Sequence, residues 1–323
     1  MKTGNRIGQA LLGLCLAASA TVFAAAPAEA AKVPAPAMKA RLAAKVPVTG
    51  LVRAGSALVA VGDYGTIVRS ADEGRTWQQA EVPVSTLLTA VHFVDEAHGW
   101  AVGHGGVILA TADGGATWQV QVTLDDKPVL LSVYFADAQR GYAVGAYGAA
   151  FVTRDGGHKW TRLAVGSGHD GDLHLNHIFG TRDGKLFIAA ETGVAFRSTD
   201  RGASWTRLAT GVSGSLWSGL ERTDGEIVLL GMSGRVIASR DGGTSWQVRD
   251  TGTEQSLTSG IALANGGLIV VGAGGVVLRG SGTAPFQLEV RPDRQNLAAV
   301  VAAPTGAVVV AGQLGVERLV PGK

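Results

Sequence analysis

The chain has 323 residues, a formal net charge of +2 and one cysteine, Cys15. So small a net charge excludes a strong electrostatic drive toward nucleic acid, and one cysteine excludes both an internal disulfide and a multi-cysteine metal site.

The first thirty residues are typical of a secretory signal peptide. Lys2 and Arg6 precede an apolar stretch from Ile7 to Ala26, and Ala28-Glu29-Ala30 fits a small-x-small cleavage site. We expect cleavage after Ala30, which would remove the cysteine and place the protein in the periplasm or otherwise outside the cytoplasm. The alternative is an uncleaved membrane anchor. No later stretch approaches the ~20 apolar residues of a membrane span, so the mature chain is expected to have none.

An eight-residue turn, Ser/Thr-x-Asp-x-Gly-x-Ser/Thr-Trp, occurs five times with its tryptophans 41 to 45 residues apart; only Lys159 departs from the pattern. This period, with several short apolar runs per unit, predicts a β-propeller. The Asp is expected to accept backbone N–H bonds, the Gly to adopt positive φ and the Trp to pack against strands, all scaffolding roles. The Asp and Trp pairs are Asp72 and Trp77, Asp113 and Trp118, Asp155 and Trp160, Asp200 and Trp205, and Asp241 and Trp246.

A Gly-x-x-Gly element, weaker in the fourth unit, marks seven units, with its last glycine at 65, 106, 148, 193, 234, 275 and 315. We therefore predict an all-β, seven-bladed propeller of four-stranded antiparallel blades over residues 46–323. The seventh unit contains only three apolar runs, so we expect residues 37–45 to close the ring as the outer strand of the last blade. Residues 31–45 would then form a tether and this closing strand.

The unit from Ala97 to Trp118 (AHGWAVGHGGVILATADGGATW) resembles the photosystem II stability and assembly factor family, in its exported proteobacterial branch, within the wider Asp-box (BNR), sialidase-like propellers. The resemblance covers residues 46–323. It implies a non-catalytic propeller, expected to be monomeric, that binds a membrane or periplasmic protein and assists its assembly, stability or operation. It also implies a basic partner surface, whose comparable positions are Arg53, Arg69, Arg197, Arg235, Arg240 and Arg279. The alternative for each is an ordinary solvated arginine.

The other class of function is a carbohydrate-binding or glycoside-hydrolysing propeller. A sialidase would need an arginine triad and a tyrosine nucleophile, but no arginine motif is evident, and Tyr64 and Tyr147 fall in the repeated Gly-x-x-Gly turns. A two-carboxylate glycosidase could use only the non-repeated acids Asp172, Glu191 and Glu221. We therefore expect no enzymatic activity.

Two non-repeated features are expected to line the central channel. Residues 169–177 (HDGDLHLNH) are rich in His and Asp, and strand alternation would turn His174 and Asn176 toward the channel, near Asp172. Two ligands on one strand are too few for a metal site, so we expect a polar loop that caps strand ends or binds channel water, and neither metal nor cofactor; the alternative is a metal site. Trp217 stands where other units have Thr, Leu, Asn or Ala, and would either anchor a ligand at the channel mouth or fill the axis.

Overall fold

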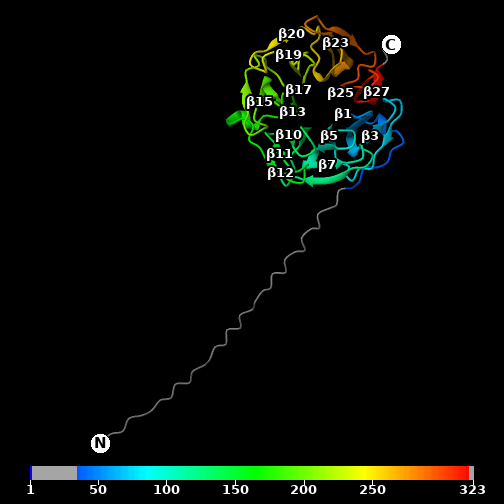
Figure 1. The fold of residues 1–323 in the computed structure, drawn as a ribbon. Helices are drawn as coiled ribbons and strands as arrows, with labels where there is room; N and C mark the ends of the chain where they lie inside the picture. The colour runs from blue at the N-terminus through cyan, green and yellow to red at the C-terminus, as the bar shows by residue number, and fades with distance from the viewer. Residues whose placement is uncertain (2–34, 320–323) are drawn as a thin grey trace. The chain divides into compact units, whose positions relative to one another are not determined.

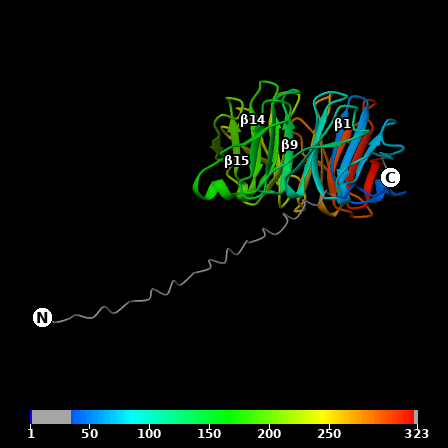
Figure 2. The same ribbon diagram turned by 90° about the horizontal axis from the view of Figure 1, so that it is seen from below.

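The computed structural model describes Met1 and residues 35–319, and these confirm the predicted all-β propeller. Seven antiparallel sheets surround a central axis; the first six have four strands and the last has three. Strands β1, β5, β13, β17 and β25 lie nearest the centre (Figure 1), and the side view shows the strands crossing the thickness of the ring (Figure 2). The signal peptide and its cleavage site fall outside the described residues. No helix in the described part is long and apolar enough to cross a membrane.

The strands follow the blades in chain order. Blade 1 is Val48–Ala54 (β1), Ala57–Gly62 (β2), Ile67–Ser70 (β3) and Gln78–Gln79 (β4); blade 2 is Leu88–Phe93 (β5), Gly99–Gly103 (β6), Val107–Thr111 (β7) and Gln119–Thr123 (β8); blade 3 is Leu130–Phe135 (β9), Gly141–Gly145 (β10), Ala150–Thr153 (β11) and Trp160–Arg162 (β12). Blade 4 is Leu175–Gly180 (β13), Leu186–Ala190 (β14), Ala195–Ser198 (β15) and Thr206–Leu208 (β16); blade 5 is Leu216–Glu221 (β17), Ile227–Gly231 (β18), Val236–Ser239 (β19) and Gln247–Arg249 (β20). Blade 6 is Leu257–Ala262 (β21), Gly267–Gly272 (β22), Val276–Ser281 (β23) and Gln287–Val290 (β24); blade 7 is Leu297–Ala302 (β25), Val308–Gly312 (β26) and Gly315–Leu319 (β27). Short 3-10 turns are Ala43–Lys45 (η1), Asp63–Gly65 (η2), His104–Gly106 (η3), Gly168–Asp172 (η4), Glu191–Gly193 (η5) and Ala273–Gly275 (η6).

The core lies between neighbouring blades. Second strands such as β2 and β18 are buried along their whole length, as expected for apolar strands covered on both faces. Trp100 of blade 2 stacks on Phe135 of blade 3 with ring centroids 3.5 Å apart. Sequential burial of this kind makes each blade depend on the next.

Each innermost strand contains a β-bulge at its second residue. The bulge is seen in the pairing register with the second strand of the blade, which skips that position. A bulge re-aims the side chains that follow it. At four bulges the side chain also bonds the next blade: Thr89 Oγ1, for example, donates to the Leu130 carbonyl at 2.6 Å. Thr49, Asn176 and Thr258 make the same bond to Leu88, Leu216 and Leu297. The inner ring is thus tied by side chains as well as by packing.

The Asp-box turn has the internal hydrogen bonds that its sequence predicts. In the fourth copy Asp200 accepts bonds from the backbone N–H and the hydroxyl of Ser204, and from the hydroxyl of Ser198. The Ser204 side-chain bond is the main cause that lowers the pKa of Asp200 to about 2. Gly202 has φ of 81°, a conformation that glycine adopts at little cost.

The turn is also hydrogen-bonded to the preceding blade, a role that the repeated sequence alone did not predict. The carbonyl of the residue after the Asp accepts a hydrogen bond from a side chain of the blade before. Arg69 Nε donates to Gly114 O at 3.0 Å and Arg197 to Gly242 O at 2.7 Å. Trp100 and Tyr142 make the equivalent bonds to Gly156 O and Arg201 O. Arg69 and Arg197 therefore hold blades together.

Blade 6 has lost the Asp box, and a buried ion-pair network takes over the contact between blades 5 and 6. Arg222, with a side chain 4% exposed, pairs with Glu226 at 2.9 Å. It also donates to the carbonyls of Gly266 and Gly282 in blade 6, at 2.8 and 3.1 Å. Arg249 bonds both Glu226 and Gly282.

The predicted closing strand is wrong. Residues 37–45 contain no strand, and Ala43–Lys45 forms the turn η1. The segment instead follows blade 1, where the Ala37 N–H donates to the Val82 carbonyl at 3.0 Å. η1 contacts β27 as well as β3 and β4, and β25 lies against β1. The ring is therefore closed by packing at the junction of blades 7 and 1, and within the described residues blade 7 has three strands.

Candidate functional site

The two ends of the ring differ in chemistry. We call the end that carries the turns 70–77, 111–118, 153–160, 198–205 and 239–246 the box face. The opposite end, which carries the turns after β2, β6, β10, β14, β18, β22 and β26, is the glycine face. Third strands such as β15 run from the glycine face to the box face, so residues at the two ends of such a strand cannot share one site.

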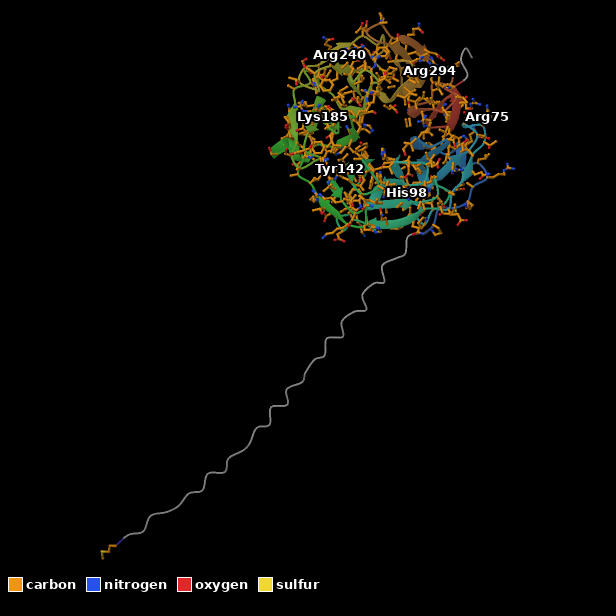
Figure 3. The ribbon with its side chains drawn as sticks, viewed as in Figure 1. Arg75, His98, Tyr142, Lys185, Arg240 and Arg294 are labelled. Carbon is orange, nitrogen blue, oxygen red and sulfur yellow. The ribbon has the colours of Figure 1, made fainter. Side chains whose placement is uncertain are left out.

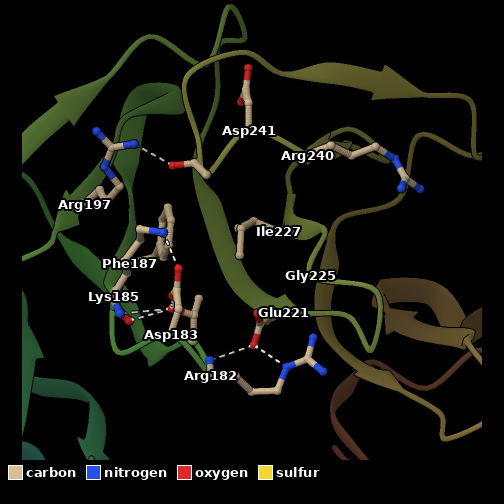
Figure 4. Close-up of a pocket in the computed structure, with 12 residues that line it drawn as sticks. Arg182, Asp183, Lys185, Phe187, Arg197, Glu221, Gly225, Ile227, Arg240 and Asp241 are labelled. Carbon is tan, nitrogen blue, oxygen red and sulfur yellow. Dashed lines mark hydrogen bonds and ion pairs between the residues drawn. The ribbon is translucent and has the colours of Figure 1, made fainter.

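A groove of about 610 Å³ opens between blades 4 and 5 on the box face. Four basic and three acidic side chains line it over an apolar floor of Phe187 and Ile227 (Figure 4), and Figure 3 shows Lys185 and Arg240 on this sector of the ring. The charged side chains are Arg182, Lys185, Arg197, Arg240, Asp183, Glu221 and Asp241.

The cations in the groove are held in place by partners on its walls. Arg182 Nε lies 3.1 Å from Glu221 Oε2, and Arg182 also donates to the Arg222 carbonyl at 2.8 Å. Lys185 pairs with Asp183, and this hydrogen bond is the main cause that lowers the pKa of the Asp183 carboxyl. Arginine and lysine donors fixed in this way can bind carboxylate or carbonyl oxygens of an extended peptide with little loss of side-chain entropy.

The structure does not gather the six arginines of the sequence analysis into one patch. Arg197 and Arg240 line the groove, whereas Arg69 is engaged between blades 1 and 2. Exposed Arg53 is the second-last residue of the inner strand of blade 1, and Arg279 lies 3.8 Å from Glu289 in blade 6. Arg235 precedes β19, at the glycine face.

Sequence reasoning missed Arg182 and Lys185, which complete the groove. Both lie in the hairpin Thr181–Lys185 between β13 and β14, where a Thr-Arg-Asp-Gly-Lys run is typical of an exposed turn. Only the position of this hairpin beside the next blade brings Arg182 to Glu221.

The central channel forms a second cavity, of about 350 Å³. Asn176 and Trp217 are among its lining residues, but Asp172 and His174 are not. The bulge at Asn176 breaks the expected alternation, so His177 rather than His174 shares the channel with it. His174 precedes β13; its Nδ1 lies 3.6 Å from Glu191 Oε1.

His92 and Tyr134 also line the channel. No feature of the repeated sequence predicted them as channel residues. Their ring centroids are 5.0 Å apart. Burial lowers the pKa of His92 to about 4, and burial with the proximity of His92 does the same for His177. Both imidazoles are therefore neutral near pH 7.

Of the three acids that a glycosidase could use, Glu221 lies apart from Asp172 and Glu191, which both belong to the glycine face of blade 4. Glu191 follows β14 at the glycine face, beside His174, whereas Glu221 ends β17 in the box-face groove. Two-carboxylate glycosidases hold their pair within about 10 Å, and a strand of six residues separates these ends by roughly 17 Å. In the described residues no group of three His, Cys, Asp or Glu side chains is placed to hold a metal ion.

Comparison with known proteins agrees with this architecture. The family model described as photosynthesis system II assembly factor YCF48 matches residues 69–127 and 119–215, whereas curated proteins give no match. A structure of YCF48 bound to D1 peptide has a TM-score of 0.71 at 18% identity, covering 89% of this chain and 99% of that one.

Two other solved structures share the fold. YCF48 from Cyanidioschyzon merolae has a TM-score of 0.68 at 16% identity and covers 87% of this chain and 96% of its own. A streptogramin B lyase reaches 0.75 at 11% identity, over 85% and 93%. At such identities the structures establish the fold alone. The family model confirms the resemblance found in the sequence over residues 69–215, whereas the exported proteobacterial branch stays a prediction.

Proposed function

We propose that this protein is a non-catalytic, exported propeller that binds an extended segment of a membrane or envelope protein and assists its assembly. The observation that carries the proposal is the match of the YCF48 family model to residues 69–215. A related propeller has been solved with a D1 peptide bound, which supports a peptide as the kind of ligand. The signal-peptide pattern of residues 1–30 supports export, and the protein would act as a monomer.

The groove between blades 4 and 5 is the binding site we propose. Its apolar floor is buried, with Phe187 fully covered and Ile227 3% exposed, so it offers a firm base rather than a hydrophobic patch. Arg182 and Arg240 keep 62% and 56% of their side chains exposed at the rim. Such cations favour an acidic segment or a carboxyl terminus, which they would bind by charge-assisted hydrogen bonds.

Site-specific photo-cross-linking tests this proposal. The full chain is expressed in cells of its source organism with benzoyl-phenylalanine at position 181, which lines the groove, or at position 53, on the box face of blade 1. We expect one membrane-protein adduct from position 181 that is absent from position 53. Changing Arg182 and Lys185 to Gln should weaken that adduct at least fivefold, whereas the matched change Arg162→Gln, at an exposed position of blade 3, should not.

The outcomes separate the function from the site. An adduct seen equally from both positions, or unchanged in the Arg182 and Lys185 variant, would contradict the groove as the binding site but would still identify a partner. If no envelope protein is cross-linked from either position or from a set of positions on the glycine face, the assembly role itself is wrong.

A further inference from the structure

Within the part of the chain that the structure describes, the central channel is lined entirely by uncharged side chains. Its cavity of about 350 Å³ takes residues from all seven innermost strands, and no Asp, Glu, Lys or Arg is among them. The volume lies in the lower part of the range of small-molecule sites, about 300–1,000 Å³. A charged ligand would lose its hydration without gaining a counter-charge, so this cavity selects against carboxylates, phosphates and amines.

The two channel histidines have fixed and opposite hydrogen-bonding roles. His177 Nδ1 accepts the N–H of Gly219 at 3.2 Å, which leaves the proton on Nε2 as a donor. His92 Nε2 lies 3.0 Å from the Phe135 carbonyl, so Nε2 carries the proton and Nδ1 is left as an acceptor. Neither free nitrogen has a partner among the described residues.

Blades 4 to 6 add hydroxyl and amide groups to a channel lining that already includes hydroxyls of blades 1 to 3. Asn176 donates its amide to the Leu216 carbonyl at 2.9 Å, which leaves its Oδ1 as an acceptor. Ser218 and Ser259 line the cavity at the residue after the bulge, and no hydrogen bond of their hydroxyls is found within the described part of the chain. Three neighbouring blades thus present donors and acceptors at one level.

Trp217 lies among these groups of blades 4 to 6. It is the bulge residue of blade 5, lines the cavity between Asn176 of blade 4 and Thr258 of blade 6, and is 38% exposed. Because the bulge falls at the start of β17, the indole lies toward the glycine face. A large aromatic ring left in contact with solvent beside unpaired polar groups is typical of a binding site rather than of a core.

We propose that the channel is a binding site for one uncharged sugar ring, stacked on Trp217 and hydrogen-bonded by Asn176, His177 and Ser218. A pyranose has an apolar face of C–H groups and a rim of hydroxyls, each both donor and acceptor. That pattern matches one exposed indole beside mixed neutral donors and acceptors. The site is separate from the groove, which opens between the blades on the box face, so either proposal can fail alone.

Titration of the full chain with neutral sugars tests the site. D-Glucose, D-galactose, D-mannose and N-acetyl-D-glucosamine serve as probes, with D-glucuronate as the charged counterpart, followed by calorimetry and saturation-transfer NMR. We expect saturable binding of at least one neutral sugar, at least tenfold weaker binding in Trp217→Leu, and weaker binding in Ser218→Ala. Val248→Ala, an exposed change on outer strand β20, should bind as the unaltered chain does.

Three outcomes would overturn the proposal. The first is that none of the four neutral sugars binds saturably. The others are that binding survives both channel substitutions, or that D-glucuronate binds as tightly as D-glucose. Thermal melting confirms that each variant is folded; if Trp217→Leu is not, Trp217→Phe and Ser259→Ala take its place.

Discussion

Glu226 is the residue on which the contact between blades 5 and 6 depends. Its side chain is 1% exposed and its carboxylate meets three arginines: Arg222 at 2.9 Å, Arg240 at 3.1 Å and Arg249. Replacing Glu226 with Gln keeps the shape but removes the charge, so Arg222, itself 4% exposed, loses its 2.9 Å ion pair and keeps only the Asp224 carboxylate, 3.9 Å from its Nε. Breaking a buried pair in this way costs about 3–5 kcal/mol.

Equilibrium unfolding in urea, followed by circular dichroism, measures this loss. For a domain of this size we expect Glu226→Gln to lower the melting temperature by about 6–15 °C and to shift the urea midpoint with little change in slope. The matched control is Asp126→Asn, which breaks the exposed Asp126–Arg162 pair, 69% and 54% exposed. An exposed pair contributes about 0–1 kcal/mol, so this control should hardly change.

A double variant separates charge from packing. Arg222→Met combined with Glu226→Leu removes both buried charges, and apolar replacements of a buried pair are often neutral or stabilising. We expect it to regain at least half of the stability lost in Glu226→Gln, a coupling that a mutant cycle quantifies. A Glu226→Gln variant within 1 kcal/mol of the unaltered protein would refute the reasoning, because the network would then not replace the lost Asp box.

Three further predictions concern the turns and the closure. The pKa of Asp200 is lowered to about 2 in the fold, so its stabilising bonds are fully present above the unfolded pKa of about 4 and are lost as pH falls toward 2; Asp200→Asn should flatten the decline of melting temperature over that range, and an unchanged slope would contradict this. Tyr142→Phe leaves the carbonyl of the next box turn without its 2.7 Å bond and should lower the unfolding free energy by about 1 kcal/mol in urea titration, a loss that an unshifted midpoint would disprove. Gly315→Ala places a Cβ 2.0 Å from the Ala44 carbonyl, whereas Gly306→Ala, at a similar positive φ, meets nothing within 4 Å; the first should lower the melting temperature far more, and equal effects would argue against closure at this contact.

The blades could be predicted because their signal is local and repeated. The Asp-box turn and the Gly-x-x-Gly element are each made by residues close in sequence, so the spacing of Trp77 and its four counterparts defines the blade length. The closing strand failed for a local reason too. Met38–Lys45 (MKARLAAK) has no β-branched residue and is rich in helix formers, and it forms a 3-10 turn at its end.

The groove and the channel were harder to predict because their residues meet between blades. Arg182 and Glu221 are 39 positions apart, nearly one blade length, and nothing in either segment signals the other. The bulge at Asn176 likewise depends on how β13 pairs with β14; simple alternation therefore placed His174, rather than His177, in the channel. Trp217 could be singled out because it departs from its own repeat.

The junction between blades 7 and 1 is where we expect the ring to open first during unfolding. Six blades are followed in the chain by a covalent connection to the next, whereas blade 7 meets blade 1 through packing of β25 on β1 and the contact of η1 with β27. Local unfolding begins where the fewest constraints must be released. Amide hydrogen exchange should therefore be faster in β26 and β27 than in β10 or β18, because the ring opens first at this junction.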